Sequence, residues 1–326
     1  MIGDGMGIAQ IQAAVLAADH TLNLEGLSNI GFSKTNNVEG KITDSAAGGT
    51  AMACGVKTYN GAIGMDANKQ PVKSILHYAE EAGLASGLVA TSTITHATPA
   101  SFIAHEESRK SYQAIARDFL DTDIDVFIGG GYNDFARRDD GLNLIDSLTA
   151  RDYQVVTDQA ELAAIKTGKL AALLNEGPVP PVALGRGDML PEAAAKAIEL
   201  LKQDPDGFFL MVEGSQIDWG GHENNIGYVV TELLDFDKAI GQVLDFARQD
   251  GNTLVIITAD HETGGLSLPG VDVLGDSTAV NFSTDYHTGV MVPVYAYGPG
   301  AEAFRGTYEN TAIFDKMMAA LGLDKH

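Results

Sequence analysis

Side chains that can bind cations stand next to several apolar runs in this sequence. Glu213, Asp218 and His222 come after one such run, and Asp260 and His261 come after another. The remaining candidates, which also flank apolar runs, are Asp4, His96, Thr98 and His287. Zinc takes histidine nitrogen and carboxylate oxygen in four-coordinate sites, whereas magnesium prefers six oxygen ligands. These residue types could therefore supply sites for both cations.

The spacing within one of these groups also carries information. Asp218 and His222 are four positions apart, so a helical turn would place both side chains on one face. Gly220 and Gly221 lie between them and make a regular helix less certain. A single Asp-x-x-x-His pair recurs by chance, and an aspartate at the end of a strand often only caps a helix. A metal site therefore needs the support of several groups together.

The stretch TDSAAGGTAMACG, residues 43–55, predicts a helix built almost entirely from small side chains. Ser45 would lie near its N-terminus, where backbone N–H groups and the helix dipole favour an anion. A zinc ion in contact with the Ser45 hydroxyl would activate it as a nucleophile, and Asp44 could position the hydroxyl or a cation. The commoner role of Thr43, Asp44 or Ser45 is helix capping, and the segment alone leaves both roles open.

Strand-like apolar runs alternate with helical patterns along the chain. The strands are predicted at 85–91, 125–129, 153–156, 207–214, 252–260 and 290–298, and the helices at 73–83, 111–122, 191–204, 228–251 and 311–323. Several of the strand runs are almost continuously apolar, as in parallel strands buried on both faces. The pattern predicts a three-layer α/β/α sandwich with a large, mostly parallel central sheet. The candidate side chains would gather at the carboxyl edge of that sheet.

Composition limits both the number of domains and the kind of partner. No break in composition divides the 326 residues, which predicts one domain, 1–326, with irregular insertions around 132–190 and 263–286. Asp and Glu outnumber Lys and Arg by 44 to 21, for a net charge of −23, which argues against nucleic acid or an anionic membrane as the partner. No run of 18 apolar residues predicts membrane insertion. The one cysteine, Cys54, rules out an internal disulfide.

Six motifs in this order resemble those of the alkaline phosphatases. They are GDGMG at 3–7, TDSAAGGTAMACG at 43–55, THATPASFIAHEESR at 95–109, VEGSQIDWGGH at 212–222, TADHETGG at 258–265 and HTG at 287–289. The resemblance spans nearly the whole chain, and six ordered motifs are far more specific than any one of them.

The resemblance implies two zinc ions and one magnesium ion for each chain. Its implied ligands are Asp218, His222 and His287 for one zinc, Asp4, Asp260 and His261 for the second, and Asp4, Thr98 and Glu213 for magnesium. Asp4 would bridge two of these sites, and the second zinc would also hold Ser45.

Further roles follow from the same resemblance. Ser45 would be the nucleophile that becomes phosphoserine, and Arg109 would bind the phosphoryl oxygens with its planar fork. His96 and Trp219 stand where the best-known enterobacterial members have Asp and Lys, while other branches of the family carry His and Trp there. These two changes leave the reaction class intact. They bear on how tightly phosphate is held and on how strongly the third site prefers magnesium.

The implied function is hydrolysis of phosphate monoesters to alcohol and inorganic phosphate. No residue was identified that would grip the alcohol, so we expect a broad substrate range. The family also implies an alkaline optimum and a homodimer. Asp4 should end a central strand, yet only three residues precede it. We therefore expect further residues and an export signal upstream of Met1, and a periplasmic or secreted protein.

Two other readings compete with this one. A phosphodiesterase or phosphonate-ester hydrolase of the same superfamily would also use a Ser or Thr beside two metals. Such enzymes lack the combination of Ser45, Arg109 and a third site at Thr98 and Glu213. A non-catalytic phosphate- or metal-binding protein could use helix N-termini and the glycine-rich turns at 3–7 and 129–131. A Rossmann reading is weaker, because GDGMG lacks the G-x-G-x-x-G spacing.

Overall fold

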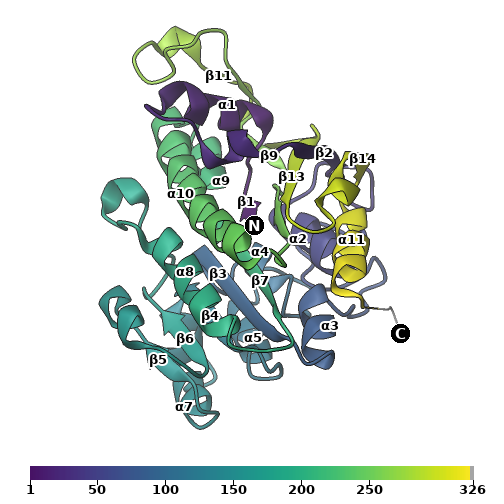
Figure 1. Ribbon diagram of the computed structural model, residues 1–326, viewed down its shortest axis with the longest axis vertical. Helices are drawn as coiled ribbons and strands as arrows, with labels where there is room; N and C mark the ends of the chain where they lie inside the picture. The colour runs from purple at the N-terminus through teal and green to yellow at the C-terminus, as the bar shows by residue number, and fades with distance from the viewer. Residues whose placement is uncertain (324–326) are drawn as a thin grey trace.

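A six-stranded parallel sheet forms the centre of the computed structural model, which describes residues 1–323 (Figure 1). In spatial order its strands are β1 (Ile2–Gly3), β7 (Phe208–Gly214), β3 (Ala85–Thr93), β4 (Val126–Gly130), β6 (Leu170–Leu173) and β5 (Gln154–Val156). Each neighbouring pair in this order runs parallel. Their carboxyl ends therefore meet at one edge, which is where a ligand site forms in such sheets.

A second, four-stranded sheet continues the first beyond β1. Its order is β14 (Gly306–Glu309), β2 (Asn29–Lys34), β13 (Val292–Tyr297) and β8 (Val255–Ile257). Strand β13 runs antiparallel to both neighbours, whereas β14 runs parallel to β2. A parallel bridge between Ile2 and Thr258 joins the end of β8 to β1. This bridge brings the residues that follow β1 and β8 to the same place.

Helices cover both faces of the sheets (Figure 1). One apolar core packs α1 (Ile8–Ala17), α8 (Met189–Leu201) and α10 (Ile226–Asp250) against one face. The other core contains α2 (Ser45–Cys54), α3 (Ile75–Glu81), α4 (Ala97–Ala100), α5 (Tyr112–Asp118), α6 (Tyr132–Ala136), α7 (Leu144–Thr149) and α11 (Thr311–Leu321). Side chains alternate between the cores along each strand, as Leu88 and Val89 do in β3. The predicted α/β/α sandwich is confirmed.

The predicted strands and helices correspond to β3, β4, β5, β7, β8 and β13 and to α3, α5, α8, α10 and α11. The elements that the pattern did not reveal include α1, α7, β2 and β6, of which β6 lies buried between β4 and β5 in the central sheet. Its sequence, LAAL, is short, and alanine does not favour strands. Residues 132–190, expected to be irregular, thus supply two strands of the central sheet. Within residues 1–323, no helix combines the length and apolar character needed to cross a membrane.

A buried ion cluster fastens α10 to the segment before α8. Arg186 donates to Glu232 and to Asp235, both on α10, and all three side chains are almost fully buried. The same Glu232 accepts a hydrogen bond from the backbone N–H of Val182 in the short helix η3 (Val182–Leu184). Three buried charged groups are tolerated here because each one is paired with a group of opposite charge.

Removing the arginine should therefore destabilise the fold. We expect Arg186→Ala to lower the free energy of unfolding by about 3–5 kcal/mol, because Glu232 and Asp235 would be left buried and unpaired. Arg248→Ala is the matched control, since the Arg248–Asp245 pair is solvent-exposed and contributes at most about 1 kcal/mol. Equilibrium unfolding in urea measures both. Equal losses for the two variants would contradict this account.

Candidate active site

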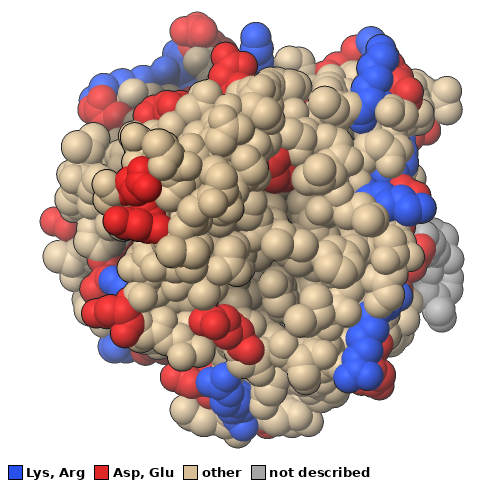
Figure 2. Space-filling view, turned by 90° about the horizontal axis from the view of Figure 1, so that it is seen from above, with Lys and Arg blue, Asp and Glu red and all other residues tan. Residues whose placement is uncertain are grey.

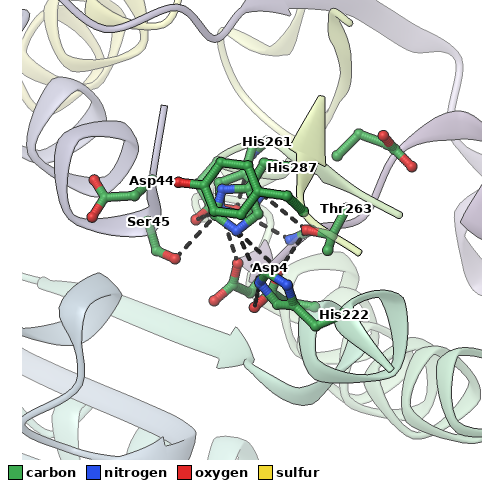
Figure 3. A network of polar contacts seen from close by, with 12 residues as sticks. Asp4, Asp44, Ser45, His222, His261, Thr263 and His287 are labelled. Atoms are coloured by element: carbon green, nitrogen blue, oxygen red, sulfur yellow. Dashed lines mark hydrogen bonds and ion pairs between the residues drawn. The ribbon is translucent and has the colours of Figure 1, made fainter. Parts of the chain in front are cut away.

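The candidate residues meet at the carboxyl ends of β1, β3, β7 and β8. Asp4 follows β1, Glu213 lies near the end of β7, and Ile2 and Glu213 are paired directly in the sheet. Asp260 and His261 follow β8, which is bridged to β1. Figure 3 shows Asp4, His222, His261 and His287 turned toward one another. Pairing within the sheets thus assembles groups that are far apart in the sequence.

Helix α9 (Gln216–His222) carries two of these groups on one face, as their spacing predicted. The helix forms in spite of Gly220 and Gly221. The absence of a side chain at both positions allows neighbouring elements to pack closely against it. A Cβ atom on Gly220 would lie 2.6 Å from the backbone nitrogen of Val229, and one on Gly221 would lie 2.9 Å from Thr263. These glycines therefore let α9 approach α10 and the strand that carries Thr263.

The first cluster consists of Asp218, His222 and His287. The Nε2 atoms of the two histidines are 3.1 Å apart. They lie 3.4 Å and 3.5 Å from the carboxylate oxygens of Asp218. Nδ1 of His222 is 2.6 Å from the carbonyl oxygen of Asp285, and Nδ1 of His287 is 2.8 Å from that of Thr43. A carbonyl only accepts, so each Nδ1 carries a hydrogen and each Nε2 is left as a metal-binding atom.

Two imidazole lone pairs this close need a proton or a cation between them. Hydrogen bonding to Asp218 raises the pKa of His222 to about 9, while burial lowers the pKa of His287 to about 4. The two Nε2 atoms thus hold one proton between them near neutral pH. A divalent cation can take the place of that proton, and two nitrogens with one carboxylate are ligands that suit zinc.

The second cluster surrounds His261 and includes the Ser45 hydroxyl. Nε2 of His261 lies 3.3 Å from Ser45 Oγ, 3.4 Å from Asp4 Oδ1 and 3.2 Å from Asp260 Oδ2. Asp260 Oδ1 accepts the backbone N–H groups of Gly5 and His261, which leaves Oδ2 without a hydrogen bond. Every one of these side chains is buried. The arrangement places the Ser45 oxygen beside a set of potential metal ligands.

Thr263 fixes the orientation of His261. Its hydroxyl donates to Asp218 Oδ1, so the Thr263 oxygen can only accept from Nδ1 of His261, 3.2 Å away. Nδ1 therefore carries the hydrogen, and Nε2 faces Ser45 as a ligand atom. Burial lowers the pKa of His261, but the carboxylates of Asp260 and Asp218 outweigh it and raise that pKa overall.

The third cluster is formed by Asp4, Thr98 and Glu213. It brings together buried oxygen atoms that have no hydrogen-bond partner among residues 1–323. These atoms are both carboxylate oxygens of Asp4, the hydroxyl of Thr98 and Oε1 of Glu213. Burial, followed by repulsion from Asp260 and Asp218, raises the pKa of Asp4 well above its usual range. Burial also raises the pKa of Glu213 to about 7. These oxygens lack partners, and the two carboxyl groups resist ionisation. A bound cation would pair with the oxygens and stabilise the ionised carboxylates, so the cluster fits a cation site.

Among residues 1–323, three groups of side chains each offer ligand atoms that lie within 4.8 Å of one another. The first group is Asp218, His222 and His287, the second is Asp4, Asp218 and His261, and the third is Asp4, His96 and Glu213. The first group equals the first cluster. The second shares Asp4 and His261 with the second cluster but contains Asp218. The third brings His96 to Asp4 and Glu213, so a nitrogen ligand stands beside the oxygen atoms expected there.

Asp44 serves as a helix cap and also holds Arg109. Its Oδ1 accepts the backbone N–H of Ala47 at 3.0 Å, and its Oδ2 accepts Nη1 of Arg109 at 3.1 Å. Nη2 of Arg109 lies 3.3 Å from Nε2 of His96. The helix-capping role that the sequence left open for Asp44 is therefore observed, together with an ion pair to Arg109. Ser45 begins α2, and Arg109 is fixed at the same cavity.

The cavity has a volume of about 300 Å³. It is lined by Asp44, Ser45, His96, Arg109, Asp218, Trp219, His222, Tyr286 and His287. Trp219 therefore belongs to the wall of the site, as its place in the motif indicated. A larger cavity of about 590 Å³, lined largely by apolar side chains, lies beside the amino-terminal half of β7 and contains none of the candidate residues.

Polar residues outside the predicted ligand set also support the site, and two of them, Gln10 and Ser215, were not identified from the sequence. Glu262 accepts hydrogen bonds from Gln10, from the backbone of Leu266 and from Thr288. It thereby ties β9 (Glu262–Thr263) to β12 (His287–Thr288), which pair antiparallel. Ser215 donates to Glu213 Oε2 at 2.6 Å and so leaves Oε1 free. Glu262 and Ser215 lie inside the quoted motifs, which was the one available signal, whereas Gln10 lies outside them.

Acidic and basic side chains are mixed on the surface and in the site cavity. On the face in Figure 2, lysine and arginine side chains stand singly or beside acidic ones, without a continuous basic area. Of the residues that line the site cavity, Arg109 is the one lysine or arginine, and Asp44 and Asp218 lie with it. An anionic substrate would therefore meet a cavity whose fixed charges do not attract it.

Comparison with known proteins gives consistent matches over nearly the whole chain. The family model described as alkaline phosphatase matches residues 1–281 and 276–323. Alkaline phosphatase 3 of Bacillus subtilis is 35% identical over an alignment 407 positions long, which covers 98% of this chain and 88% of that protein. The structure of alkaline phosphatase from the Antarctic bacterium TAB5 matches with a TM-score of 0.94 and 43% identity, covering 99% of this chain and 97% of that one.

A second structure from the same bacterium concerns the third metal site of that enzyme. It is a variant in which a histidine is replaced by aspartate, with magnesium bound in its M3 site. It matches with a TM-score of 0.93 and 43% identity, covering 99% of this chain and 97% of that one.

The shifted pKa values predict how the stability of chelated protein depends on pH. The pKa of Glu213 rises from 4.5 to about 7 on folding, so folding binds a proton that is lost as the pH approaches 7. The pKa of His222 rises from 6.5 to about 9, so its stabilising proton is lost between these values. Both groups make the metal-free protein less stable as the pH rises.

We therefore expect EDTA-treated wild-type protein to lose several degrees of melting temperature relative to EDTA-treated Glu213→Gln between pH 5 and pH 7, since the amide does not titrate. The difference between the two proteins isolates Glu213 from groups whose lowered pKa acts in the opposite direction, such as His96 and His287. Zinc and magnesium should remove this relative fall, because a cation replaces the lost proton. Differential scanning fluorimetry measures each melting temperature. A difference that stays constant over this interval would contradict the prediction.

Proposed function

The chain belongs to the alkaline phosphatase family and is a phosphatase that acts on phosphate monoesters, and we propose that it works through a phosphoserine intermediate on Ser45. The observation that carries this proposal is the position of the Ser45 hydroxyl. It lies at the N-terminus of α2, 3.3 Å from Nε2 of His261 and beside unpaired buried carboxylate oxygens. Arg109 faces the same cavity.

The residues then have definite tasks in two displacements. Ser45 Oγ loses its proton and attacks phosphorus, while the bond from phosphorus to the ester oxygen breaks and the alkoxide leaves with that electron pair, taking up a proton to become the alcohol. Water then loses a proton and attacks phosphorus, the bond to Ser45 Oγ breaks, and Ser45 regains its proton as inorganic phosphate is released. The N–H groups at the start of α2 and the guanidinium of Arg109 bind the phosphoryl oxygens. Bound zinc ions would supply Lewis-acid stabilisation of the attacking and leaving oxygens. Asp44 keeps Arg109 in place throughout.

We assign one zinc ion to the first cluster, a second to the second cluster and a magnesium ion to the third. The nitrogen-rich first cluster and the His261 environment of the second suit zinc, and the oxygen atoms of the third suit magnesium. The charges of the cavity support the need for cations. With Asp44 and Asp218 beside a single Arg109, phosphate would bind poorly without them.

The third site differs from an all-oxygen site because His96 stands beside it. Asp4, His96 and Glu213 offer ligand atoms within 4.8 Å of one another. Burial, followed by the charge of Arg109, lowers the pKa of His96 to about 4, so its imidazole is neutral, and its Nε2 faces the guanidinium of Arg109. The Antarctic variant that binds magnesium in its M3 site has an aspartate in place of a histidine. We infer that His96 weakens the preference of the third site for magnesium in this chain.

Substrate range, assembly and location rest on the family resemblance. We propose a broad range of phosphate monoesters, because the polar groups of the cavity are accounted for by phosphate and cations. We also propose an alkaline optimum, a homodimer and a periplasmic or secreted location. A diesterase remains the competing enzyme, and a non-catalytic phosphate binder would form no covalent adduct with Ser45. Comparing the turnover of a monoester with that of a diester distinguishes the proposed phosphatase from a diesterase.

The first test uses p-nitrophenyl phosphate and the purified protein. We expect activity to be lost with EDTA, restored by zinc and increased further by magnesium. Ser45→Ala should reduce kcat by about a thousandfold or more, since it removes the nucleophile. Ser28→Ala, at an exposed serine away from the cavity, is the matched control. Full activity of Ser45→Ala, or no turnover by folded, zinc-loaded protein, would rule out the proposed mechanism.

The second test concerns the third metal site. We expect His96→Asp to lower the magnesium concentration for half-maximal activation by about tenfold, because a carboxylate replaces a neutral nitrogen beside a hard cation. His20→Asp, at an exposed histidine, adds the same charge elsewhere. Magnesium titrations of zinc-loaded protein measure both. An unchanged magnesium requirement in His96→Asp would show that His96 does not govern this site.

A further inference from the structure

Tyr286 is the one residue of the cavity wall to which neither the sequence motifs nor the proposed chemistry assigns a role. Its ring stacks on the ring of His287 with centroids 4.6 Å apart and an interplanar angle of 6°. His287 in turn stacks on His261 at 3.5 Å and 17°. Tyr286 thus ends a column of three rings, two of which belong to the predicted metal ligands.

The outer side of this column is open. Tyr286 keeps 46% of its surface accessible although one face of its ring lies against His287. Its hydroxyl forms no hydrogen bond with any residue in the described part of the chain. Tyr286 lines the same cavity as Ser45, Asp44 and Arg109.

The position of Tyr286 is nevertheless well fixed by its backbone. Its carbonyl oxygen accepts the N–H of Gly264 at 2.9 Å, and its own N–H donates to the hydroxyl of Thr284 at 3.1 Å. The first bond holds the segment that precedes His287 against the loop that follows His261, and the second is a local bond within that segment. A ring that is held in this way loses little freedom when a ligand binds to it.

The other aromatic residue of the cavity wall is Trp219. It lies edge-to-face with His96, with centroids 6.2 Å apart. The remaining lining residues are Asp, Ser, His and Arg, and the phosphoryl group and the cations account for them. The two aromatic rings are therefore the parts of the wall available to the alcohol portion of a substrate.

We propose that Tyr286 binds the alcohol portion of the substrate and favours monoesters whose alcohol carries an aromatic ring, such as nucleoside monophosphates and aryl phosphates. The proposal rests on the proposed phosphatase function and adds a preference within its broad range. Aromatic rings stack on planar partners whatever their hydrogen-bonding groups, so this surface selects a class of substrate and not a single compound.

A merely structural role for Tyr286 would have a different consequence. If the ring only supported His287, its removal would weaken metal binding and reduce the turnover of every substrate by the same factor. If the ring binds the alcohol, its removal reduces the turnover of aromatic substrates more than that of others. The ratio of kcat/KM for two matched substrates separates these roles.

The matched pair is adenosine 5′-monophosphate and methyl riboside 5-phosphate, which share the same primary alkoxide leaving group and differ in the base. We expect zinc-loaded wild-type protein to favour the nucleotide by about fivefold or more in kcat/KM. Tyr286→Leu should reduce this preference to nearly one, and Tyr286→Phe, which keeps the ring, should retain it within about twofold.

Each outcome is decisive. Equal kcat/KM for the two substrates in wild-type protein, or an unchanged ratio in Tyr286→Leu, would overturn the proposal while turnover itself still supports the phosphatase function. Loss of turnover by the same factor for both substrates in Tyr286→Leu would show a structural role. No hydrolysis of either substrate by the folded, zinc-loaded wild-type protein would instead overturn the proposed function, and this inference with it.

Discussion

The constraint on which this structure depends is the burial of several carboxylates in one small volume. Asp4, Glu213, Asp218 and Asp260 are all buried where β1, β7 and β8 end. Buried carboxylates cannot all stay ionised side by side unless positive charge is supplied. The pKa of Asp4 is driven well upward for this reason. Strand pairing forces these groups together, so the fold itself creates the demand for cations.

The groups around the carboxylates make this demand selective. Backbone carbonyls of Asp285 and Thr43 fix the tautomers of His222 and His287, and Thr263 does the same for His261. Each histidine therefore presents Nε2 to the cavity and not its N–H. Orientation of this kind is as much a part of a metal site as the ligands, because a rotated imidazole offers a proton where a lone pair is needed.

The sequence revealed those features that depend on local spacing or on the end of a strand. Asp218 and His222 could be placed on one helical face from their spacing alone. The contact of Gln10 with Glu262 could not, because it joins residues 252 positions apart through packing that no local pattern records. Strand β6 escaped for a similar reason, since LAAL becomes a strand only through its place between β4 and β5. Tyr286 lies in a stretch of small polar residues and carries no periodic signal.

The balance of charge around Arg109 bears on how firmly the site holds phosphate. Asp44 takes one N–H of the guanidinium and offsets part of its charge, and no lysine joins it in the cavity wall. Trp219, which lies next to His96 in this wall, adds no charge. The binding of an anion then depends mainly on the cations and on the N-terminus of α2. Tight binding of the product would slow turnover, since an enzyme gains from binding the transition state more strongly than the product. We therefore expect this wall to favour release of inorganic phosphate, and to leave recognition of the alcohol to aromatic surfaces.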